Sequence, residues 1–292
     1  MKALSGHTQP FAVLGHPIGH TLSPVMHNAA FQSLGLDAIY LAFDVAPPRL
    51  MGVLQSMESM GFRGVNLTVP LKEVAFKGLD TLDDSAKRLG AVNTVEFTAQ
   101  GLRGHNTDGK GFLTAIREAF DFSVKGASLF ILGCGGAGRA VAITAAVEGA
   151  DHLILADIDE ARCRNIAGEI ATFAPSTRVE LAGQTPAGWI TRTARADLIV
   201  QASPVGMKAD DICPLPPAAF KKGQLAFDLV YNRPETCFTK AAVEGNARAV
   251  NGLGMLLHQG AEAFTIWTGK PAAVGVMRAA LEKALYDTVS LR

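Results

Sequence analysis

Excess charge and long apolar runs are both missing from this 292-residue sequence, and each absence narrows its possible functions. Lysine plus arginine and aspartate plus glutamate both number 27, so no charge excess points to nucleic acid or to a membrane surface. No run approaches the ~18 apolar residues of a membrane helix. We therefore expect a small-molecule partner, with no nucleic acid and no membrane.

Closely spaced cysteines are also absent. The four cysteines (Cys134, Cys163, Cys213 and Cys237) contain no CxxC pair, and the seven histidines show no metal-ligand spacing. Disulfides and a bound metal are therefore not expected, and no Ser-His-Asp or Cys-His nucleophile signature is present. Residues 1–9 lack the apolar core of a secretory signal, which makes a reducing cytoplasm the expected compartment.

Strand-like and helix-like segments alternate along most of the chain, which predicts an α/β fold with two domains. The early segments predict an α/β domain over residues 1–108, which we expect residues 253–292 to complete with two amphipathic helices. Residues 109–252 predict a parallel-sheet nucleotide-binding domain of the Rossmann type. The strands are expected at 11–15, 38–45, 64–69, 91–97, 101–106, 129–132, 152–156, 198–202 and 224–231, and the main helices at 48–60, 83–89, 109–120, 137–148, 160–173, 255–268 and 272–286.

The stretch from Ser128 to Ala140 has the pattern of a dinucleotide-binding turn. An apolar strand ends at Gly133, and the spacing Gly133-x-Gly135-x-x-Gly138 opens into a helix. Glycines let the backbone turn and approach a ligand, while free amides at a helix start favour an anion. The cofactor-binding candidates here are Gly133, Cys134, Gly135, Gly136 and Ala137.

Asp157 ends the next strand, about twenty residues beyond the glycines, where this fingerprint places an acid. Its carboxylate can accept both hydroxyls of the adenosine ribose, or it can cap the following helix. The 2′-phosphate of NADP would bring like charge beside it, at a cost of about 1 kcal/mol in water and about 4 kcal/mol near a protein surface. NAD is therefore the expected cofactor, with NADP possible.

Polar residues at strand ends in the first domain form the candidate substrate site. A nicotinamide cofactor implies hydride transfer, and metal-free reduction of a ketone needs an acid beside the developing alkoxide. Lys72 and Asp108 are the predicted acid–base pair, because a carboxylate can orient a lysine amine. Lys72 can equally be a solvated helix lysine, and Asp108 a helix cap. Ser23 can likewise be only a helix cap, and Gln259 only a surface residue. The remaining candidates are Thr21, Thr68 and Asn93.

Several motifs in order along the chain resemble the shikimate dehydrogenase family. They are Gly15-x-Pro17-Ile18-x-His20-x-x-Ser23-Pro24-x-x-His27-Asn28, Asn66-Leu67-Thr68-Val69-Pro70-x-Lys72, Gly90-Ala91-Val92-Asn93-Thr94, Gly104-x-Asn106-Thr107-Asp108, Gly133-x-Gly135-Gly136-Ala137, Asp228-x-Val230-Tyr231-x-x-Pro234-x-Thr236 and Gly254-Met255-Leu256-x-x-Gln259. The resemblance implies reversible reduction of 3-dehydroshikimate to shikimate, in the route to chorismate and the aromatic amino acids, by a monomer or homodimer.

Residue roles are also implied by this resemblance. Thr21 and Ser23 would hold the substrate carboxylate, and Lys72 would donate and accept the proton with Asp108 as its partner. The substrate hydroxyls and ring would contact Thr68, Asn93, Asp108, Tyr231 and Gln259. The cofactor would be lined by residues 133–137, Asp157, Leu229 and Gly252.

The sequence departs from the family pattern at three places. Thr21 stands where the family usually has serine, and its methyl group adds bulk at the carboxylate end of the ring. Ala156-Asp157-Ile158 replaces the Asn-Arg-Thr run that grips the 2′-phosphate of NADP, and Gln201 replaces an asparagine. The acid at 157 resembles NAD-preferring quinate/shikimate dehydrogenases, so oxidation of quinate is the alternative function. A non-catalytic nucleotide and metabolite sensor is a remote alternative, because it has no need of both Lys72 and Asp108.

Overall fold

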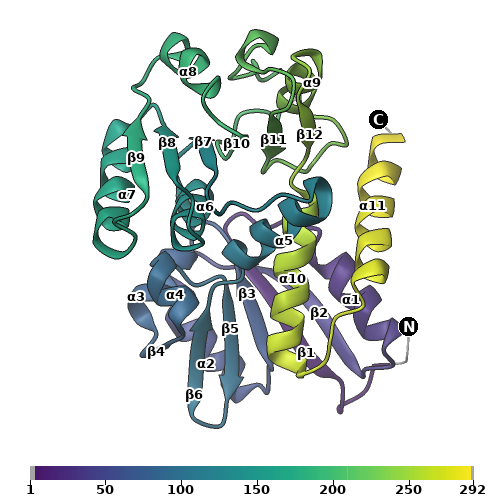
Figure 1. Cartoon of the computed structure of the whole chain (residues 1–292). Helices are drawn as coiled ribbons and strands as arrows, with labels where there is room; N and C mark the ends of the chain where they lie inside the picture. The colour runs from purple at the N-terminus through teal and green to yellow at the C-terminus, as the bar shows by residue number, and fades with distance from the viewer. Residues whose placement is uncertain (1–3, 209, 291–292) are drawn as a thin grey trace. The chain divides into compact units, whose positions relative to one another are not determined.

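The computed structural model describes residues 4–208 and 210–290, and its chain divides into two compact units. The first unit is Met1–Gly111 with Leu257–Arg292, and the second is Phe112–Leu256. Both divisions fall inside helices, α5 (Asp108–Phe120) and α10 (Leu253–Thr268), which Figure 1 labels. The sequence pattern places the boundaries at the starts of these two helices instead.

A mixed six-stranded sheet forms the centre of the first unit, with spatial order β2-β1-β3-β5-β6-β4. Strands β1, β2 and β3 are parallel, whereas β5 runs antiparallel to β3 and forms a hairpin with β6. The bounds of the strands are β1 Gln9–Gly15, β2 Ala38–Asp44, β3 Gly64–Leu67, β4 Thr81–Leu82, β5 Thr94–Thr98 and β6 Gly101–His105. The helices of this unit, besides α5 and α10, are α1 Ser23–Ser33, α2 Leu50–Ser59, α3 Lys72–Gly78, α4 Asp84–Leu89 and α11 Val274–Ser290, with a 3-10 turn at Pro47–Arg49.

The two faces of this sheet bury different kinds of side chain, because successive strand residues point to opposite faces. One face packs Ala12, Leu14 and Val65 against aliphatic residues of α2, α3 and α4. On the other, Phe11 and Tyr40 join an aromatic cluster with residues of α1 and α10. Helix α11 packs against α1, so segments from the two ends of the sequence lie in one unit.

All neighbouring strands of the second unit are parallel, in the order β12-β11-β10-β7-β8-β9. Numbered from β7, this is the order 6-5-4-1-2-3 of a doubly wound dinucleotide-binding sheet. Its strands are β7 Ser128–Leu132, β8 His152–Ala156, β9 Arg178–Leu181, β10 Leu198–Gln201, β11 Leu225–Asp228 and β12 Arg248–Val250. Its helices are α6 Gly136–Val147, α7 Glu160–Phe173, α8 Pro186–Thr193 and α9 Cys237–Glu244, with a 3-10 turn at Pro217–Ala219.

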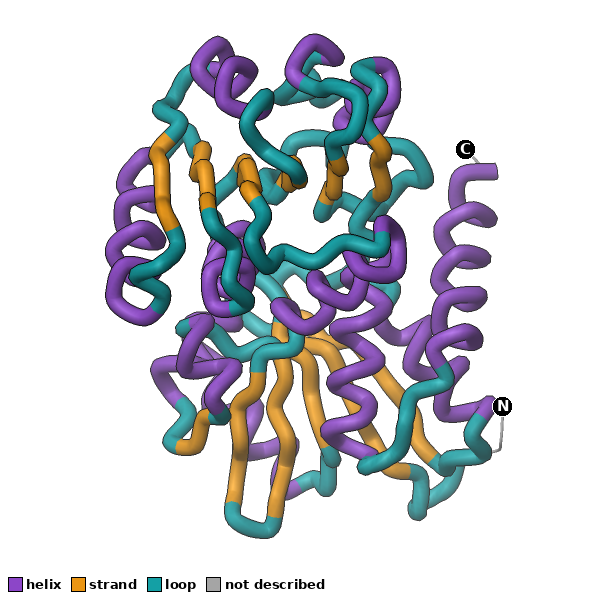
Figure 2. The backbone as a smooth tube through the Cα atoms, viewed as in Figure 1, coloured by secondary structure: helices purple, strands orange, loops and turns teal. Residues whose placement is uncertain are grey.

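Strand β7 shows how this sheet is buried on both sides. Leu129 and Ile131 pack with residues of α5, α6 and α7, whereas Phe130 and Leu132 pack with residues of α8 and α9. Figure 2 shows the strands of this unit side by side with helices and loops on both sides. An apolar run without alternation is the expected signature of such a strand.

The predicted α/β class with a Rossmann-type sheet is confirmed. Several element limits differ from the sequence pattern. Strand β5 begins at Thr94 and not at residue 91, and β11 ends at Asp228 and not at residue 231, because the polar residues beyond these points bond to side chains and loops. The short elements β4, β9, α8, α9 and β12 were not predicted. Among residues 4–208 and 210–290, no helix combines the length and apolar character that crossing a membrane requires.

Candidate active site

Lys72 and Asp108 form an ion pair in the first unit. Lys72 is the first residue of α3, which follows the carboxyl end of β3, and Asp108 is the first residue of α5. The Nζ of Lys72 lies 2.6 Å from Oδ2 of Asp108, and their side chains are 22% and 11% exposed. This contact brings together two residues 36 positions apart and contradicts a solvated role for Lys72.

Asp108 is fixed by neutral partners as well as by the lysine. Its Oδ1 accepts a hydrogen bond from Nδ2 of Asn93 at 2.8 Å, and its backbone N–H donates to Oδ1 of Asn106. The Asn93 side-chain oxygen in turn accepts from the backbone N–H of Thr107 at 2.8 Å. Asn93 and Thr107 are each only 2% exposed, so their hydrogen bonds are shielded from solvent and hold the carboxylate in one orientation. Its side chain is therefore engaged with Lys72 and Asn93.

Tyr40, which sequence reasoning did not place in a site, extends this network through Asn66. Tyr40 donates from its hydroxyl to Oδ1 of Asn66 at 2.7 Å, and Nδ2 of Asn66 donates to the Asn93 carbonyl and to Oγ1 of Thr94. Burial raises the pKa of Tyr40 well above its usual value, so the hydroxyl remains a donor. His27 stacks on this ring at 4.3 Å, and burial lowers its pKa to about 3, so it is neutral. A tyrosine inside an apolar strand gives no local signal of this role.

Thr21 and Ser23 lie together at the start of α1. The backbone N–H of Ser23 donates to Oγ1 of Thr21 at 3.3 Å, and Ser23 is the first helical residue. The residue at the cap position is Leu22, and no side chain caps this helix. The reading of Ser23 as only a helix cap is therefore wrong, and Ser23 is a buried residue of the first turn.

Thr68 follows β3 and packs against the end of β1. Its N–H donates to the Leu14 carbonyl at 2.9 Å, and its carbonyl accepts from Leu71, which begins the turn into α3. A Cβ on Gly15 would lie 2.5 Å from Cγ2 of Thr68, so the first loop needs glycine here. The threonine is thus held beside the loop that carries Thr21.

Gln259 lies on α10, half buried, where this helix crosses α5. A Cβ on Gly111 would come within 2.8 Å of both the backbone nitrogen and Cβ of Gln259. The absence of a side chain at Gly111 therefore sets the close approach of α10 to the helix that begins with Asp108.

The glycines between β7 and α6 have different surroundings. Gly133 has φ +95°, and a Cβ there would lie 2.5 Å from the backbone nitrogen of Ser203. A Cβ on Gly138 would lie 1.7 Å from the Gly133 carbonyl oxygen, so Gly138 allows close packing of helix on strand. Gly136 has open space where a side chain would stand, and Gly135 precedes the helix without a side-chain cap. A tight turn, an open approach and a close packing contact are what a pyrophosphate cradle requires.

Asp157 is held against this loop at the carboxyl end of β8. Its Oδ2 accepts from the backbone N–H of Cys134 at 2.6 Å, and its Oδ1 accepts from that of Asp159 at 2.8 Å. The cap of α7 is Asp159, which accepts from Ala161. The reading of Asp157 as the cap of this helix is therefore wrong, and Asp157 and Cys134 are brought together as neighbours.

Leu229 and Gly252 lie against each other beyond the carboxyl end of β11. A Cβ on Gly252 would lie 2.3 Å from the Leu229 carbonyl oxygen, and Gly252 donates its N–H to Val230. Tyr231 is two residues after Leu229, and burial raises the pKa of its hydroxyl. Tyr231 belongs to the second unit, whereas the other predicted substrate-binding residues belong to the first.

Asp228, which was not predicted as a site residue, is a fully buried carboxyl at the end of β11. Burial raises its pKa to about 6, although hydrogen bonds from the Thr236 hydroxyl at 2.5 Å and the Val230 N–H favour its charged form. Thr236 also caps α9 in a reciprocal pair with Thr239. Asp228 therefore fixes the loop that contains Leu229 and Tyr231.

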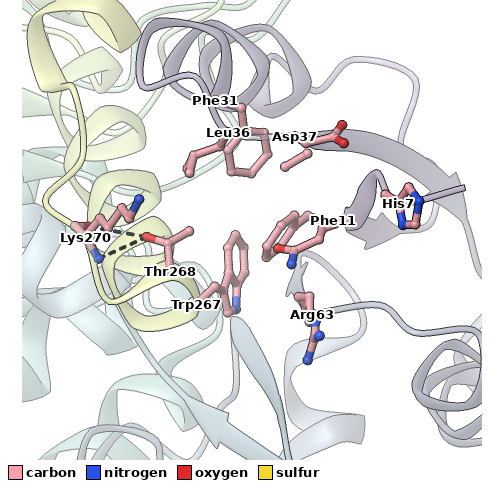
Figure 3. A pocket seen from close by; sticks show the side chains of 11 residues that line it. His7, Phe11, Phe31, Leu36, Asp37, Arg63, Trp267, Thr268 and Lys270 are labelled. Carbon is pink, nitrogen blue, oxygen red and sulfur yellow. Dashed lines mark hydrogen bonds between the residues drawn. The ribbon is translucent and has the colours of Figure 1, made fainter. Parts of the chain in front are cut away.

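A pocket of about 410 Å³ lies at the other end of the first unit's sheet, beside the amino ends of β1 and β2. Figure 3 shows the rings of Phe11, Phe31 and Trp267 between the side chains of Lys270 and Arg63. The full lining is His7, Gln9, Phe11, Phe31, Leu36, Asp37, Ala38, Arg63, Trp267, Thr268 and Lys270. This lining contains no predicted site residue.

Comparison with known proteins adds independent information. Residues 13–95 match the family model described as the shikimate dehydrogenase substrate binding domain, and residues 252–282 match the shikimate 5'-dehydrogenase C-terminal domain. The chain is 45% identical to a shikimate dehydrogenase (NADP(+)) of Moorella thermoacetica, over 98% of this chain and 96% of the relative.

Two solved structures are similar over nearly the whole chain. Shikimate 5-dehydrogenase from Listeria monocytogenes, in complex with shikimate and NAD, has a TM-score of 0.90 and 34% identity, covering 96% of this chain and 99% of that one. Quinate dehydrogenase from Corynebacterium glutamicum, in complex with NAD, has a TM-score of 0.86 and 30% identity, covering 94% and 99%. The similar structures thus include both a shikimate dehydrogenase and a quinate dehydrogenase.

Proposed function

The chain belongs to the shikimate dehydrogenase family, and we propose that it reduces 3-dehydroshikimate reversibly to shikimate, with NAD preferred over NADP. It is an oxidoreductase that acts on a CH–OH group. The observation that carries the proposed mechanism is the 2.6 Å contact of the Lys72 amine with an Asp108 carboxylate that Asn93 also holds.

The proton at Lys72 Nζ is the one that the reaction uses. In the reductive direction, the Lys72 ammonium donates a proton to the carbonyl oxygen as that oxygen becomes a hydroxyl. In the oxidative direction, the neutral amine accepts it. Asp108 stabilises the ammonium and orients Nζ, because its other oxygen is fixed by Asn93 and cannot turn away. The pair therefore supplies both the acid and the base form at one atom.

The remaining residues of the first unit bind and orient the substrate in this proposal. Thr21 and Ser23, adjacent at the start of α1, hold the carboxylate. Thr68, Asn93 and Gln259 contact the ring hydroxyls, and Tyr231 is also proposed as a substrate-binding residue. Hydroxyl and amide groups suit a small polyhydroxylated acid, since each can donate to one oxygen and accept from another.

The glycine-rich loop fits a dinucleotide. The open space at Gly136, the uncapped start of α6 and the neighbouring Asp157 support binding of pyrophosphate and ribose by residues 133–137, Asp157, Leu229 and Gly252. A bound nicotinamide dinucleotide supplies or accepts the hydride.

Charges around Asp157 support NAD over NADP. Arg162 pairs with Asp159 at 3.4 Å and Arg164 pairs with Glu160, so each nearby guanidinium already has a carboxylate partner. A 2′-phosphate would meet the Asp157 carboxylate at a cost of about 1–4 kcal/mol. The relative from Moorella thermoacetica is named for NADP, so the proposed preference for NAD would distinguish this chain from that relative.

The cofactor preference is tested by kcat/KM for NAD and NADP at fixed shikimate. We expect the wild type to favour NAD, and Asp157→Asn to narrow the ratio by roughly tenfold, the equivalent of about 1.4 kcal/mol. Glu148→Gln removes one carboxylate charge from the opposite end of α6 and is the control, which should leave the ratio unchanged. A wild-type preference for NADP would overturn the claim.

Oxidation of quinate is the second candidate, supported by the likeness to the quinate dehydrogenase and by Asp157. The two substrates are compared with NAD under the same conditions. Turnover of quinate comparable with that of shikimate would favour a quinate/shikimate dehydrogenase, and no turnover of quinate would eliminate it.

A further inference from the structure

Two of the four cysteines are in contact, one in the glycine-rich loop and the other in α7. The Sγ atoms of Cys134 and Cys163 are 3.5 Å apart and hydrogen-bonded. Cys134 stands between Gly133 and Gly135 in the loop, and Cys163 stands at the fourth position of α7. Both belong to the second unit, and neither thiol has a part in the proposed reaction.

We propose that this pair is a redox modification site, at which hydrogen peroxide forms a Cys134–Cys163 disulfide that weakens dinucleotide binding. A disulfide places its sulfur atoms about 2.0 Å apart, so these two need to approach by about 1.5 Å. That is a shift of one loop, and neither helix nor strand has to unfold. The effect on the cofactor rests on the proposed dinucleotide site, whereas formation of the bond does not.

The chemistry balances without any group beyond peroxide. The Cys163 thiolate attacks one peroxide oxygen, the O–O bond breaks, and the products are a sulfenic acid and hydroxide. The Cys134 sulfur then attacks the sulfur of the sulfenic acid, the S–O bond breaks, and a second hydroxide leaves. With the two thiol protons, the sum is two thiols and one peroxide giving one disulfide and two waters.

The surroundings favour Cys163 as the first nucleophile. Its hydrogen bond with Cys134 lowers the pKa of Cys163, and the early position in α7 also favours a thiolate. The same contact, together with burial, raises the pKa of Cys134, which therefore loses its proton less readily than Cys163. Both thiols are buried, and the exposed residues of the loop nearest to them in the sequence are Gly136 and Ala137, so peroxide would approach from that side.

The disulfide would act on the loop because its neighbours hold it from other sides. Gly133 packs against the backbone of Ala202 and Ser203, so it cannot follow Cys134 toward α7. The displacement falls on Cys134 and Gly135, whose amides lead into the start of α6. It also strains the 2.6 Å bond from the Cys134 N–H to Asp157. Pyrophosphate and ribose contacts are thereby disturbed together.

The test uses the full chain, reduced and then treated with hydrogen peroxide. Peptide mass mapping should find a Cys134–Cys163 link, and the Kd of the preferred dinucleotide should rise by roughly tenfold or more, since displacements of about 1 Å in a site can cost that much. Dithiothreitol should reverse both changes, and bound dinucleotide should slow the linkage. Cys163→Ala should keep the reduced affinity and lose the response. Cys213→Ser is the matched control and should keep the response.

Three results would overturn the proposal. They are peroxide consumption without a Cys134–Cys163 link, a link that leaves the dinucleotide Kd unchanged, and a Cys163→Ala protein that still loses affinity on oxidation. If that variant does not fold, mass mapping and reversal in the wild type still decide. A protein that forms the link and changes affinity but does not turn over shikimate would refute the proposed function and leave the thiol pair standing.

Discussion

The two units build their halves of the proposed chemistry by opposite means. In the first unit the site is a hydrogen-bonded network, which runs from the Tyr40 hydroxyl through the Asn66 side chain to the Asn93 carbonyl, and from the Asn93 side chain to Asp108 and Lys72. In the second unit, the proposed cradle depends on side chains that are absent, because backbone amides of a glycine-rich turn face an open approach. Proton transfer needs a group at a fixed atom, whereas anion binding needs only exposed backbone donors.

Replacing Lys72 should have the largest effect on turnover. Lys72→Ala removes the only group proposed to move the proton, so kcat should fall by about 10²-fold or more with little change in substrate affinity. Steady-state kinetics and substrate titration measure the two separately. The control is Lys77→Ala, which removes an exposed lysine from the same helix and should leave kcat unchanged. Unchanged turnover in Lys72→Ala would remove this residue from the mechanism. Absence of turnover in the wild type would instead favour the sensor hypothesis.

The corresponding test in the second unit adds a methyl group to a glycine of the glycine-rich turn. Gly138→Ala would place Cβ 1.7 Å from the Gly133 carbonyl oxygen, so helix α6 must move, at about 3 kcal/mol of unfolding free energy. Urea unfolding measures the loss. The control Gly136→Ala has open space for its methyl group and should fold normally but bind dinucleotide less tightly. Equal stability of the two variants would contradict the assignment of Gly138 to helix packing and of Gly136 to the ligand approach.

This contrast also explains what the sequence could predict. Glycine spacing and the acid at 157 are local patterns, so the Rossmann-type unit could be recognised from them. The pairing of Lys72 with Asp108 was predicted, but the hydrogen bond from Asn93 that also holds Asp108 was not. Tyr40 was missed because its hydroxyl reaches Asn66 across β1, a contact that depends on strand order, and no local pattern encodes strand order. Short edge elements such as β12 were missed because packing, and not periodicity, defines them.

Two carboxyl groups should give the units opposite responses to pH. Asp228, in the second unit, has its pKa raised to about 6 from 3.8, so the folded state binds the proton more tightly and stability falls as pH rises through that range. The shift of about two pH units corresponds to about 3 kcal/mol. Asp228→Asn should therefore lose less stability than the wild type between pH 4 and pH 7, measured by urea unfolding. Parallel curves would contradict the assignment.

Asp83, in the first unit, provides the counterpart. Burial alone would raise its pKa, but hydrogen bonds from His105, Ser85 and Ala86 lower the pKa to about 2. Its stabilisation is present above about pH 4 and is lost as pH falls toward 2. Asp83→Asn should accordingly be less stable than the wild type at pH 7, with the difference shrinking in acid. A difference that grows in acid would reverse the sign of this interaction.

The smallest expected effect comes from Tyr40→Phe, which tests whether a residue distant from Lys72 in the hydrogen-bonded network influences turnover. Tyr40→Phe keeps the ring stacked on His27 but leaves the Asn66 oxygen buried without its donor, at about 1–3 kcal/mol of stability. Tyr40 lies two hydrogen-bonded residues from Asp108, so a positioning role predicts a kcat lowered by several-fold at unchanged KM. A role in packing alone would lower the unfolding free energy and leave kcat at wild-type values below the melting range. Because stability and kcat are measured independently, a stable Tyr40→Phe enzyme with slowed turnover would show that Tyr40 helps to orient Lys72. No variant of the glycine-rich loop should combine normal stability with a lowered kcat at unchanged KM.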